Sequence, residues 1–595
     1  MKSLKIVFLL FVTITFSTLT AQVKEPEITT VLKEKFVDKN GNPLTGKGII
    51  IGDMDSGIDV FHPFFFFADG GEFNWIDVNA DAKFTAGVDA VDLNNDRTVT
   101  DNELLNYLEI TDKTFGPYRI SDKKVYNPDM DFLYNDKNKN GKRDYGEQGG
   151  FSESDATYGE QFFIPANFKA TELQLGEKII GLKTSKVIAV RQKDGSIRRR
   201  GVDLIKNEGD SDFNHGTSVA GMLIGGIYGL HKLHGIAPDA EIVMADIKYD
   251  YTPRFVKNFP ELMKFIKDEG ANVMLFEDGE WAWEPMDGTT PEEILARQYC
   301  EEGLPVVTAT GNLAAARCVF IDTVKSGGNY SYTVTAAEVV EGKPNNGVFV
   351  TLHWAGNPGD FKTLDIIGPD LKTYPIPTSG SGFIKKDYRI SYQYSKSEKG
   401  NVLLKLGFYK KDSATVQGDW TLNIEPKKNF LLRGSVNDVG QSWAGYTHWK
   451  YKFTNEGTLT FPATMDSTIK VGAYAVNFAW NERSVGDIAT YSGRGPAITG
   501  DLGVDICAPG HSTFAPGENF TYRIFSGTSS AAPHVTGLIA LMLQYDKTLT
   551  NSQIKSIIIN TAIQEEKMGK LPNITWGWGK LNIPAALKNL TNQNN

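Results

Sequence analysis

Apolar runs that end in small and polar residues recur along the chain. Residues 49–58 show an apolar strand pattern that enters a tight turn, and residues 306–312 repeat this pattern. Residues 215–225 and 526–537 combine small and apolar side chains, which predicts the opening turns of two buried helices. Apolar strands and buried helices together predict an α/β fold, in which a mostly parallel sheet carries helices on both faces.

A different pattern fills residues 320–458. Its apolar runs are short, and Gly, Pro, Asn and Asp separate them; they cover residues 330–334, 347–354, 401–409 and 419–424. Short runs with regular turn signals predict an antiparallel β-sandwich inserted into the α/β fold. Earlier in the chain, Asp194-Gly195 lies between two strand-like runs and predicts a β-hairpin.

Charge and the N-terminal sequence restrict the class of protein. The 595 residues include 62 basic and 72 acidic side chains, so the net charge of −10 argues against nucleic-acid binding. Residues 1–5 include two lysines and no acid, residues 6–19 carry no charge, and Ala21-Gln22 offers a small-residue cleavage site. This predicts a secretory signal peptide and a secreted protein, periplasmic or extracellular, with no integral membrane segment after signal removal.

Three cysteines are too few for a disulfide scaffold. Cys507 follows an apolar run and is expected to be a buried small hydrophobic residue. Cys300 and Cys318 flank the strand at 306–312. Their pairing in an oxidising compartment stays open, because sequence does not fix the distance between their Cα atoms.

Three short motifs carry candidate chemistry. Asp55, His215 and Ser529 each lie beside small residues. A serine hydroxyl becomes a strong nucleophile when a neutral imidazole removes its proton, and a buried carboxylate must hold that imidazole in the correct tautomer. Asp55 is expected at the carboxyl end of a strand and Ser529 at a helix N-terminus, where developing negative charge is favoured. The set predicts hydrolysis of peptide bonds.

These motifs resemble those of the subtilases, the subtilisin-like serine peptidases, which have the same chain order of Asp, His and Ser. Further similarities are Gly235-Ile236-Ala237-Pro238, Ser492-Gly493-Arg494-Gly495-Pro496, Ala508-Pro509-Gly510 and Trp576-Gly577-Trp578-Gly579. The resemblance implies that Asn312 is the side-chain oxyanion donor. It also implies that proteins or peptides are the substrates, without an organic cofactor.

The resemblance covers residues 46–312 and 460–590 and suggests a division of the chain. The expected parts are a signal peptide (1–21), a short leader (22–45), a first catalytic part (46–319) with a calcium-loop insertion at about 70–150, the β-sandwich (320–458) and a second catalytic part (459–595).

Two windows of the first insertion match the calcium-loop pattern D-x-[DN]-x-[DN]-G-x₅-E, with Arg97 replacing glycine in one of them. Oxygen ligands at positions 1, 3, 5, 7, 9 and 12 wrap one hard cation, so we expect structural Ca²⁺. The expected ligands are Asp136, Asn138, Asn140, Lys142 (through its carbonyl), Asp144 and Glu147 in one loop, and Asp92, Asn94, Asp96, Thr98, Thr100 and Glu103 in the other. A third window at Asp77 has the first three ligands and no acid at position 12. The alternative is that these windows are solvated polar loops.

The stretch expected to line the specificity pocket is acidic. Glu277, Asp278, Gly279 and Glu280 occupy a segment where subtilases usually carry small neutral residues. A carboxylate in a desolvated pocket would select Lys or Arg before the cleaved bond. The alternative is that these acids point to solvent or bind calcium.

Three functional hypotheses follow from the sequence. The first is a secreted serine endopeptidase. The second is a processing enzyme or exopeptidase whose cleft the insertions narrow. The third is an inactive, calcium-dependent binding module.

Overall fold

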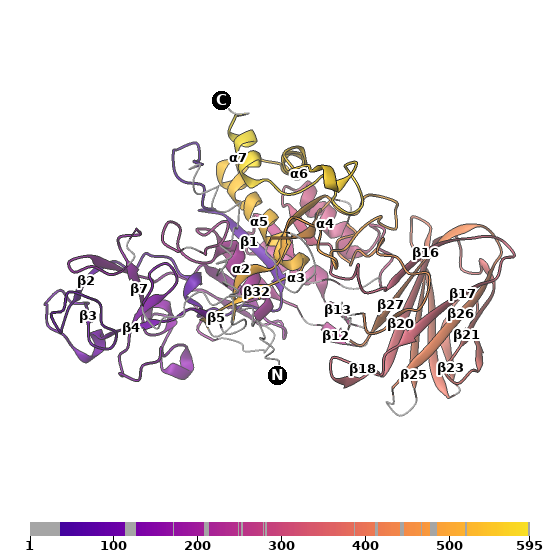
Figure 1. Cartoon of the computed structure of the whole chain (residues 1–595), viewed down its shortest axis with the longest axis horizontal. Coiled ribbons are helices and arrows are strands. Elements are labelled where there is room, and N and C mark those ends of the chain that lie inside the picture. The colour runs from indigo at the N-terminus through magenta and orange to yellow at the C-terminus, as the bar shows by residue number, and fades with distance from the viewer. Residues whose placement is uncertain are drawn as a thin grey trace, which may run out of the picture.

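The computed structural model describes residues 36–112, 126–169, 172–206, 214–231, 233–247, 249–251, 254–256, 258–277, 279, 283–385, 387–410, 415–440, 445–465, 467–476, 485–517 and 520–592. The molecule is elongated, with a central α/β body and one β-rich lobe on each side (Figure 1). The lobe near β2 and β7 comes from the first half of the chain, and the lobe around β20 and β25 comes from the second insertion.

The central sheet has eight strands in the order β10-β9-β11-β1-β14-β15-β29-β30. Their bounds are β10 (Ile197–Arg199), β9 (Val187–Arg191), β11 (Glu241–Asp246), β1 (Ile50–Asp55), β14 (Val273–Phe276), β15 (Val306–Ala309), β29 (Ile469–Ala475) and β30 (Ile506–His511). The pairs are parallel except for β9 and β10, which form the predicted hairpin. The predicted parallel-rich sheet is therefore confirmed.

Helices cover both faces of this sheet. Their bounds are α2 (Asn214–Ile224), α3 (Phe259–Asp268), α4 (Pro291–Glu301), α5 (Thr528–Tyr545), α6 (Asn551–Asn560) and α7 (Ile583–Asn592). Alternate strand residues face opposite sides, so Ile51 and Leu275 join the apolar core with α2 and α5. Met54 and Met274 join a second apolar cluster with α3 and α4. Odd-numbered positions of β1 and β14 therefore face α5.

Short elements complete the central body. They are η1 (Pro63–Phe65), η8 (Glu566–Met568), the pair β12 (Tyr249–Tyr251) and β13 (Arg254–Val256), and the sheet of β31 (Thr513–Gly517), β32 (Thr521–Phe525) and β5 (Thr111–Asp112).

The first lobe is a six-stranded antiparallel sheet with the order β3-β2-β8-β7-β6-β4. Its elements are β2 (Glu72–Ile76), β3 (Ala90–Asp92), η2 (Asp101–Glu103), β4 (Leu105–Leu108), β6 (Phe132–Asn135), η4 (Glu147–Gly149), η5 (Ala156–Tyr158), β7 (Phe162–Pro165) and β8 (Lys178–Gly181). A small apolar cluster that includes Trp75, Leu105 and Phe163 lies against it.

The second lobe consists of two antiparallel sheets around one apolar core, as the sandwich prediction requires. One sheet has the order β16-β27-β20-β25-β24-β23, with β16 (Val319–Val324), β27 (Phe430–Asp438), β20 (Gly347–Ala355), β25 (Asn401–Lys410), β24 (Tyr388–Lys396) and β23 (Ser381–Lys385). The other has the order β22-β21-β26-β17-β28, with β22 (Thr373–Pro375), β21 (Phe361–Ile367), β26 (Gly418–Pro426), β17 (Tyr330–Ala336) and β28 (His448–Trp449). The pair β18 (Val339–Val340) and β19 (Lys343–Pro344) lies beside them in the chain. Trp354, Trp420 and Trp449 are all buried in this core.

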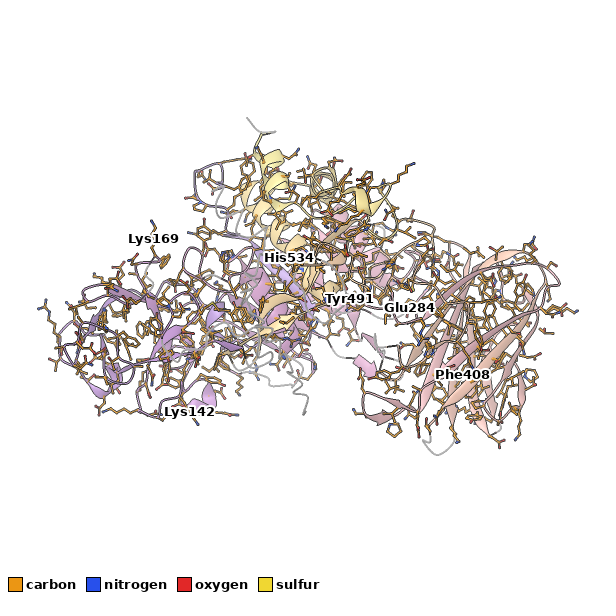
Figure 2. The ribbon with its side chains drawn as sticks, in the orientation of Figure 1. Lys142, Lys169, Glu284, Phe408, Tyr491 and His534 are labelled. Carbon is orange, nitrogen blue, oxygen red and sulfur yellow. The ribbon has the colours of Figure 1, made fainter. Side chains whose placement is uncertain are left out.

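The sandwich is attached to the central body through the segment that follows β14. The carboxylate of Asp287 accepts hydrogen bonds from Ser397 and Asn401 of the sandwich. The Nε2 of His353 lies 3.1 Å from the carbonyl oxygen of Glu284. Figure 2 shows Glu284 at this boundary and Phe408 within the sandwich.

The structure also answers the open question about the cysteines. Cys300, Cys318 and Cys507 are all buried free thiols, so Cys300 and Cys318 do not pair. Cys507 has the buried position that its apolar neighbours predict. Among the described residues, no helix has both the length and the hydropathy needed to cross a bilayer.

Candidate active site

Asp55 and His215 are in direct contact at one edge of the central sheet. Asp55 is the last residue of β1, and its side chain is fully buried. The Nδ1 atom of His215, in the first turn of α2, lies 2.7 Å and 2.9 Å from the two carboxylate oxygens. The imidazole packs edge-on against Phe525, with ring centroids 5.2 Å apart. The carboxylate thus fixes the ring and directs its proton to Nδ1.

Gly216 explains how helix and strand approach so closely. A Cβ atom at this position would lie 2.1 Å from the carbonyl oxygen of Gly57 and 3.2 Å from the Asp55 carboxylate carbon. Only glycine allows α2 to begin against the turn that carries Asp55. The His-Gly pair is therefore a packing requirement for the contact between His215 and Asp55.

Ser529 lies at the N-terminus of α5, one residue after the helix begins. Its side chain is almost buried, with 7% exposed, and its hydroxyl lies 3.3 Å from the carbonyl oxygen of Glu277 at the end of β14. The positive end of the helix dipole lies under this hydroxyl and favours negative charge that develops there.

Asn312 is held by the same helix terminus. Its Oδ1 accepts hydrogen bonds from the backbone N–H of Thr528, at 2.8 Å, and from the Thr528 hydroxyl, at 3.2 Å. Gly311 donates its N–H to the same hydroxyl and has a φ of +91°. With its oxygen fixed in this way, Asn312 keeps its amide N–H₂ for another acceptor, one residue from Ser529.

Glu277 links the two halves of the candidate site. Burial raises its pKa well above the ordinary value, and the charges of Asp53 and Asp55 raise it further. The neighbouring Ser529 hydroxyl acts in the opposite direction. The pKa of the Glu277 carboxyl group is therefore affected both by Asp55, which holds His215, and by Ser529.

The four residues expected to line the specificity pocket are described only in part. Glu277 is 4% exposed and belongs to the buried cluster. Gly279 packs closely against the backbone of Phe461, since a Cβ atom at position 279 would be 2.7 Å from the carbonyl oxygen of Phe461. Asp278 and Glu280 lie outside the described residues.

Asp53 is a functional candidate that the sequence reasoning missed. It is fully buried on β1, two positions before Asp55 and on the same face. Burial and the charge of Asp55 raise its pKa well above the ordinary value. The signal was present in the sequence, because an acidic residue inside an apolar strand is unusual.

The three acidic loops of the first lobe share one backbone geometry. In each loop the first carboxylate accepts hydrogen bonds from the N–H groups four and five positions later. These donors are residues 81 and 82 to Asp77, residues 96 and 97 to Asp92, and residues 140 and 141 to Asp136. The fifth side chain accepts the N–H two positions later, at residues 83, 98 and 142.

A second acid closes each loop by accepting the N–H groups of its second and ninth residues. Glu103 does this in the Asp92 loop. In the Asp136 loop the closing acid is Glu160, at 2.7 Å and 2.8 Å, and not Glu147 as expected. Glu147 is instead half exposed and paired with Lys206. Asp89 closes the Asp77 loop from one position beyond the expected place.

The remaining predicted ligands lie on these loops. Amide nitrogens connect Asn94 to Asp96, and Asn138 and Asn140 to Asp144, while Thr98, Thr100 and Lys142 donate backbone N–H groups to loop carboxyl or amide oxygens. Counting only His, Cys, Asp and Glu, the described part of the chain contains no cluster of three or more that could hold a metal ion. The donor sets are nonetheless made only of oxygen atoms, which suits Ca²⁺.

Residues 46–255 and 422–579 match the model of the subtilase family. Residues of this chain are 36% identical over 138 positions to tripeptidyl-peptidase 2 of Drosophila melanogaster, which is 21% of this chain and 9% of that protein. They are 36% identical over 129 positions to subtilisin of Bacillus pumilus, covering 22% of this chain and 40% of the relative. The matched segments therefore span less than half of either relative.

A solved structure resembles nearly the whole chain. The CspB protease of Clostridium perfringens aligns with a TM-score of 0.61 at 16% identity, covering 92% of this chain and 96% of that one. At this identity the likeness concerns the fold. The family match extends over more than half of the chain, in one segment before the sandwich and one that begins within it at residue 422. The chain belongs to the subtilase family of serine peptidases.

Proposed function

We propose that this protein is a secreted serine endopeptidase that uses Asp55, His215 and Ser529 as its catalytic triad. The observation that carries the proposal is the 2.7 Å contact between Nδ1 of His215 and the buried Asp55, together with the position of Ser529 at a helix N-terminus. The basic and apolar N-terminal residues support secretion.

In the proposed reaction, the Nε2 atom of His215 takes the proton of the Ser529 hydroxyl as its oxygen attacks the substrate carbonyl. The imidazolium then gives that proton to the leaving amine, and the peptide bond breaks to leave an acyl-enzyme. Water repeats the sequence, with His215 again as base, and releases the acid product. Asp55 stabilises the imidazolium throughout.

Asn312 and the backbone N–H of Ser529 are the proposed oxyanion donors. The Asn312 oxygen is already bound to Thr528, so the amide N–H₂ has a fixed direction before substrate arrives. Donors fixed in advance need no reorganisation when negative charge develops, and loss of one typically costs about 10²–10³ in turnover.

We also propose a preference for Lys or Arg before the cleaved bond. Glu277 is enclosed beside Asp53 and Asp55, which leaves Asp278 and Glu280 as the acids that would select a basic side chain. A peptide library varied at that position tests this, and a preference for Phe or Leu would contradict it.

Structural Ca²⁺ is proposed for the Asp92 and Asp136 loops. The first loop would use Asp92, Asn94, Asp96, Thr98, Thr100 and Glu103; the second would use Asp136, Asn138, Asn140, Lys142 and Asp144, with Glu160 as the closing carboxylate. When bound, the cation would neutralise carboxylates that otherwise repel each other. The catalytic steps do not involve it.

A second candidate is an exopeptidase with a narrowed cleft. Its support is the 36% identity to a protein named tripeptidyl-peptidase 2 over 138 positions. Digestion of unfolded casein at internal sites favours the endopeptidase, whereas release of short N-terminal peptides alone favours the exopeptidase.

Ser529→Ala is the variant that tests the triad. We expect activity on casein to disappear and labelling by a fluorophosphonate probe to be lost, because the triad acts as a unit. The neighbouring Ser530→Ala is the matched control and should still be labelled. Substantial turnover by Ser529→Ala would refute the assignment of the nucleophile.

A further inference from the structure

Two buried carboxyl groups near Asp55, those of Asp53 and Glu277, have an unusual environment. Asp53 is 0% exposed and Glu277 is 4% exposed. Within the described part of the chain, none of their four carboxyl oxygens has a hydrogen-bond partner by strict geometry, and neither residue forms an ion pair. Buried acids are almost always paired, because an isolated charge in an apolar interior is strongly unfavourable. Because neither acid is paired, keeping a proton is the remaining way for these groups to avoid a buried negative charge.

The register of the sheet places both groups on the face that α5 covers. Asp53 is opposite Leu275 in the parallel pair of β1 and β14, so Glu277, two residues after Leu275, lies on the same face. That face is covered by α5, whose Ser529 hydroxyl lies 3.3 Å from the Glu277 carbonyl oxygen. Asp55 shares the face as well.

The surrounding titratable groups are mostly acidic. Asp53 and Asp55 act on Glu277 from β1, and His215 on α2 faces the cluster through its contact with Asp55. Asp246 lies on β11, the neighbour of β1 on the side away from β14, and is paired with Asp55. The Nζ atom of Lys193 lies 4.0 Å from the Asp246 carboxylate. Asp278 and Glu280 lie outside the described residues.

This arrangement limits how many of the acids can ionise. Asp55 must carry its charge to orient His215. A second and third negative charge in the same buried space would each be repelled by the first, as in other carboxyl pairs that share a site. Burial raises the pKa of both Asp53 and Glu277, and the charge of Asp55 acts in the same direction on both.

We propose that Asp53 and Glu277 form a carboxyl pair on the sheet face that α5 covers, in which protonated Glu277 donates a hydrogen bond to Ser529 and loses this role when it ionises. The proposal rests on the catalytic role of Ser529 set out above. Glu277 is then a positioning residue.

The two protonation states of Glu277 treat Ser529 differently. A protonated carboxyl can donate to the Ser529 oxygen, which leaves the serine proton directed at His215. A carboxylate only accepts, so it would draw the serine hydroxyl toward itself and compete with His215 for that proton. Its charge would also repel the oxyanion that forms beside it. Both effects lower the rate as pH rises.

The test is the rate of fluorophosphonate labelling of the full chain across the pH range. Glu277→Gln cannot ionise, so its alkaline midpoint should move up or disappear. Asp53→Asn removes the acid whose negative charge would oppose ionisation of Glu277, so its midpoint should move down. Glu293→Gln is the matched control, because Glu293 is also buried and raised in pKa by burial, but caps α4. Its midpoint should match the wild type.

Opposite shifts in the first two variants support the pair, and an unchanged midpoint in folded Glu277→Gln overturns it. Infrared difference spectra of the wild type provide a second readout that does not depend on variants. A protonated-carboxyl C=O band should vanish in the same alkaline range as labelling, and its absence at neutral pH would overturn the proposal. Failure of the wild type to label at any pH would instead contradict the proposed function.

Discussion

The two lobes lie on opposite sides of the same α/β body but are stabilised in different ways. The sandwich encloses an apolar core that includes the fully buried Trp420 and Trp449. The first lobe has a smaller apolar cluster, and three of its loops are folded around carboxylates that accept backbone N–H groups. Apolar burial does not depend on ions or protons, whereas a carboxylate network does. The comparison therefore predicts that solution conditions affect the two lobes unequally.

The largest expected effect is in the core of the sandwich. Trp420 stacks on Phe408 with ring centroids 4.6 Å apart and donates its Nε1–H to the carbonyl of Val416. Trp420→Ala should cost about 3–5 kcal/mol of unfolding free energy, because it leaves a large cavity. The loss should be equal in calcium and in chelator, measured by urea unfolding in the Ser529→Ala background. Leu371→Ala, at an 86% exposed site of the same lobe, should cost under about 0.5 kcal/mol.

The next effect is in the first lobe and depends on calcium. Calcium should raise its melting temperature, because an ion that binds only the folded chain stabilises it. Glu160→Gln should weaken this stabilisation by about 1.4 kcal/mol for each tenfold loss of affinity. Glu147→Gln is the control and should keep the full calcium effect, since Glu147 pairs with Lys206. If Glu147→Gln reduced the effect and Glu160→Gln did not, the assignment of the closing acid would be reversed.

A smaller effect should appear where the sandwich joins the body. Burial acts to raise the pKa of Asp287, but hydrogen bonds from Ser397, Thr289 and Asn401 outweigh it and keep the pKa below its usual 3.8. Stability from this carboxylate is present above that value and is lost as pH falls below it. Asp287→Asn should therefore cost about 1–3 kcal/mol at neutral pH, with the difference shrinking in acid. A pH-independent difference in urea unfolding would contradict this account.

The smallest effect concerns one backbone turn in the acidic loops. Arg97 and Gly141 occupy the same position of their loops, with φ of +60° and +71°. Arg97→Gly should stabilise the first lobe by about 0.5–1 kcal/mol, because glycine adopts this conformation without strain. Gly141→Ala should destabilise by a similar amount. Two changes of the same sign in thermal melts would show that the loops are not equivalent.

The sequence predicted those features of the fold that depend on patterns of neighbouring residues. The parallel-rich sheet and the antiparallel sandwich follow from run lengths and turn residues, and the structure confirms both. Asp55 and His215 were recognised because glycine must follow wherever helix and strand meet so closely. These features depend on residues that are neighbours in the chain.

Contacts between segments that are far apart in the sequence could not be predicted from the sequence patterns. Glu160 closes the Asp136 loop from 24 positions after its first residue, because the chain leaves the loop and returns at β7. A template with fixed spacing selected Glu147 instead. The buried pair of Asp53 and Glu277 depends on the register of β1 against β14, which no spacing along the chain reveals.

The position of the sandwich also has a consequence for the order of folding. The hydroxyl oxygens of Thr308 in β15 and of Thr468, directly before β29, lie 3.4 Å apart, although 160 positions separate these residues. Closing such a long loop costs chain entropy before any contact is gained. The sandwich fills most of that interval and has a core of its own, so its early folding would bring the two strands close together. We therefore expect the segment around Asn312 to be assembled only after the inserted lobe has formed.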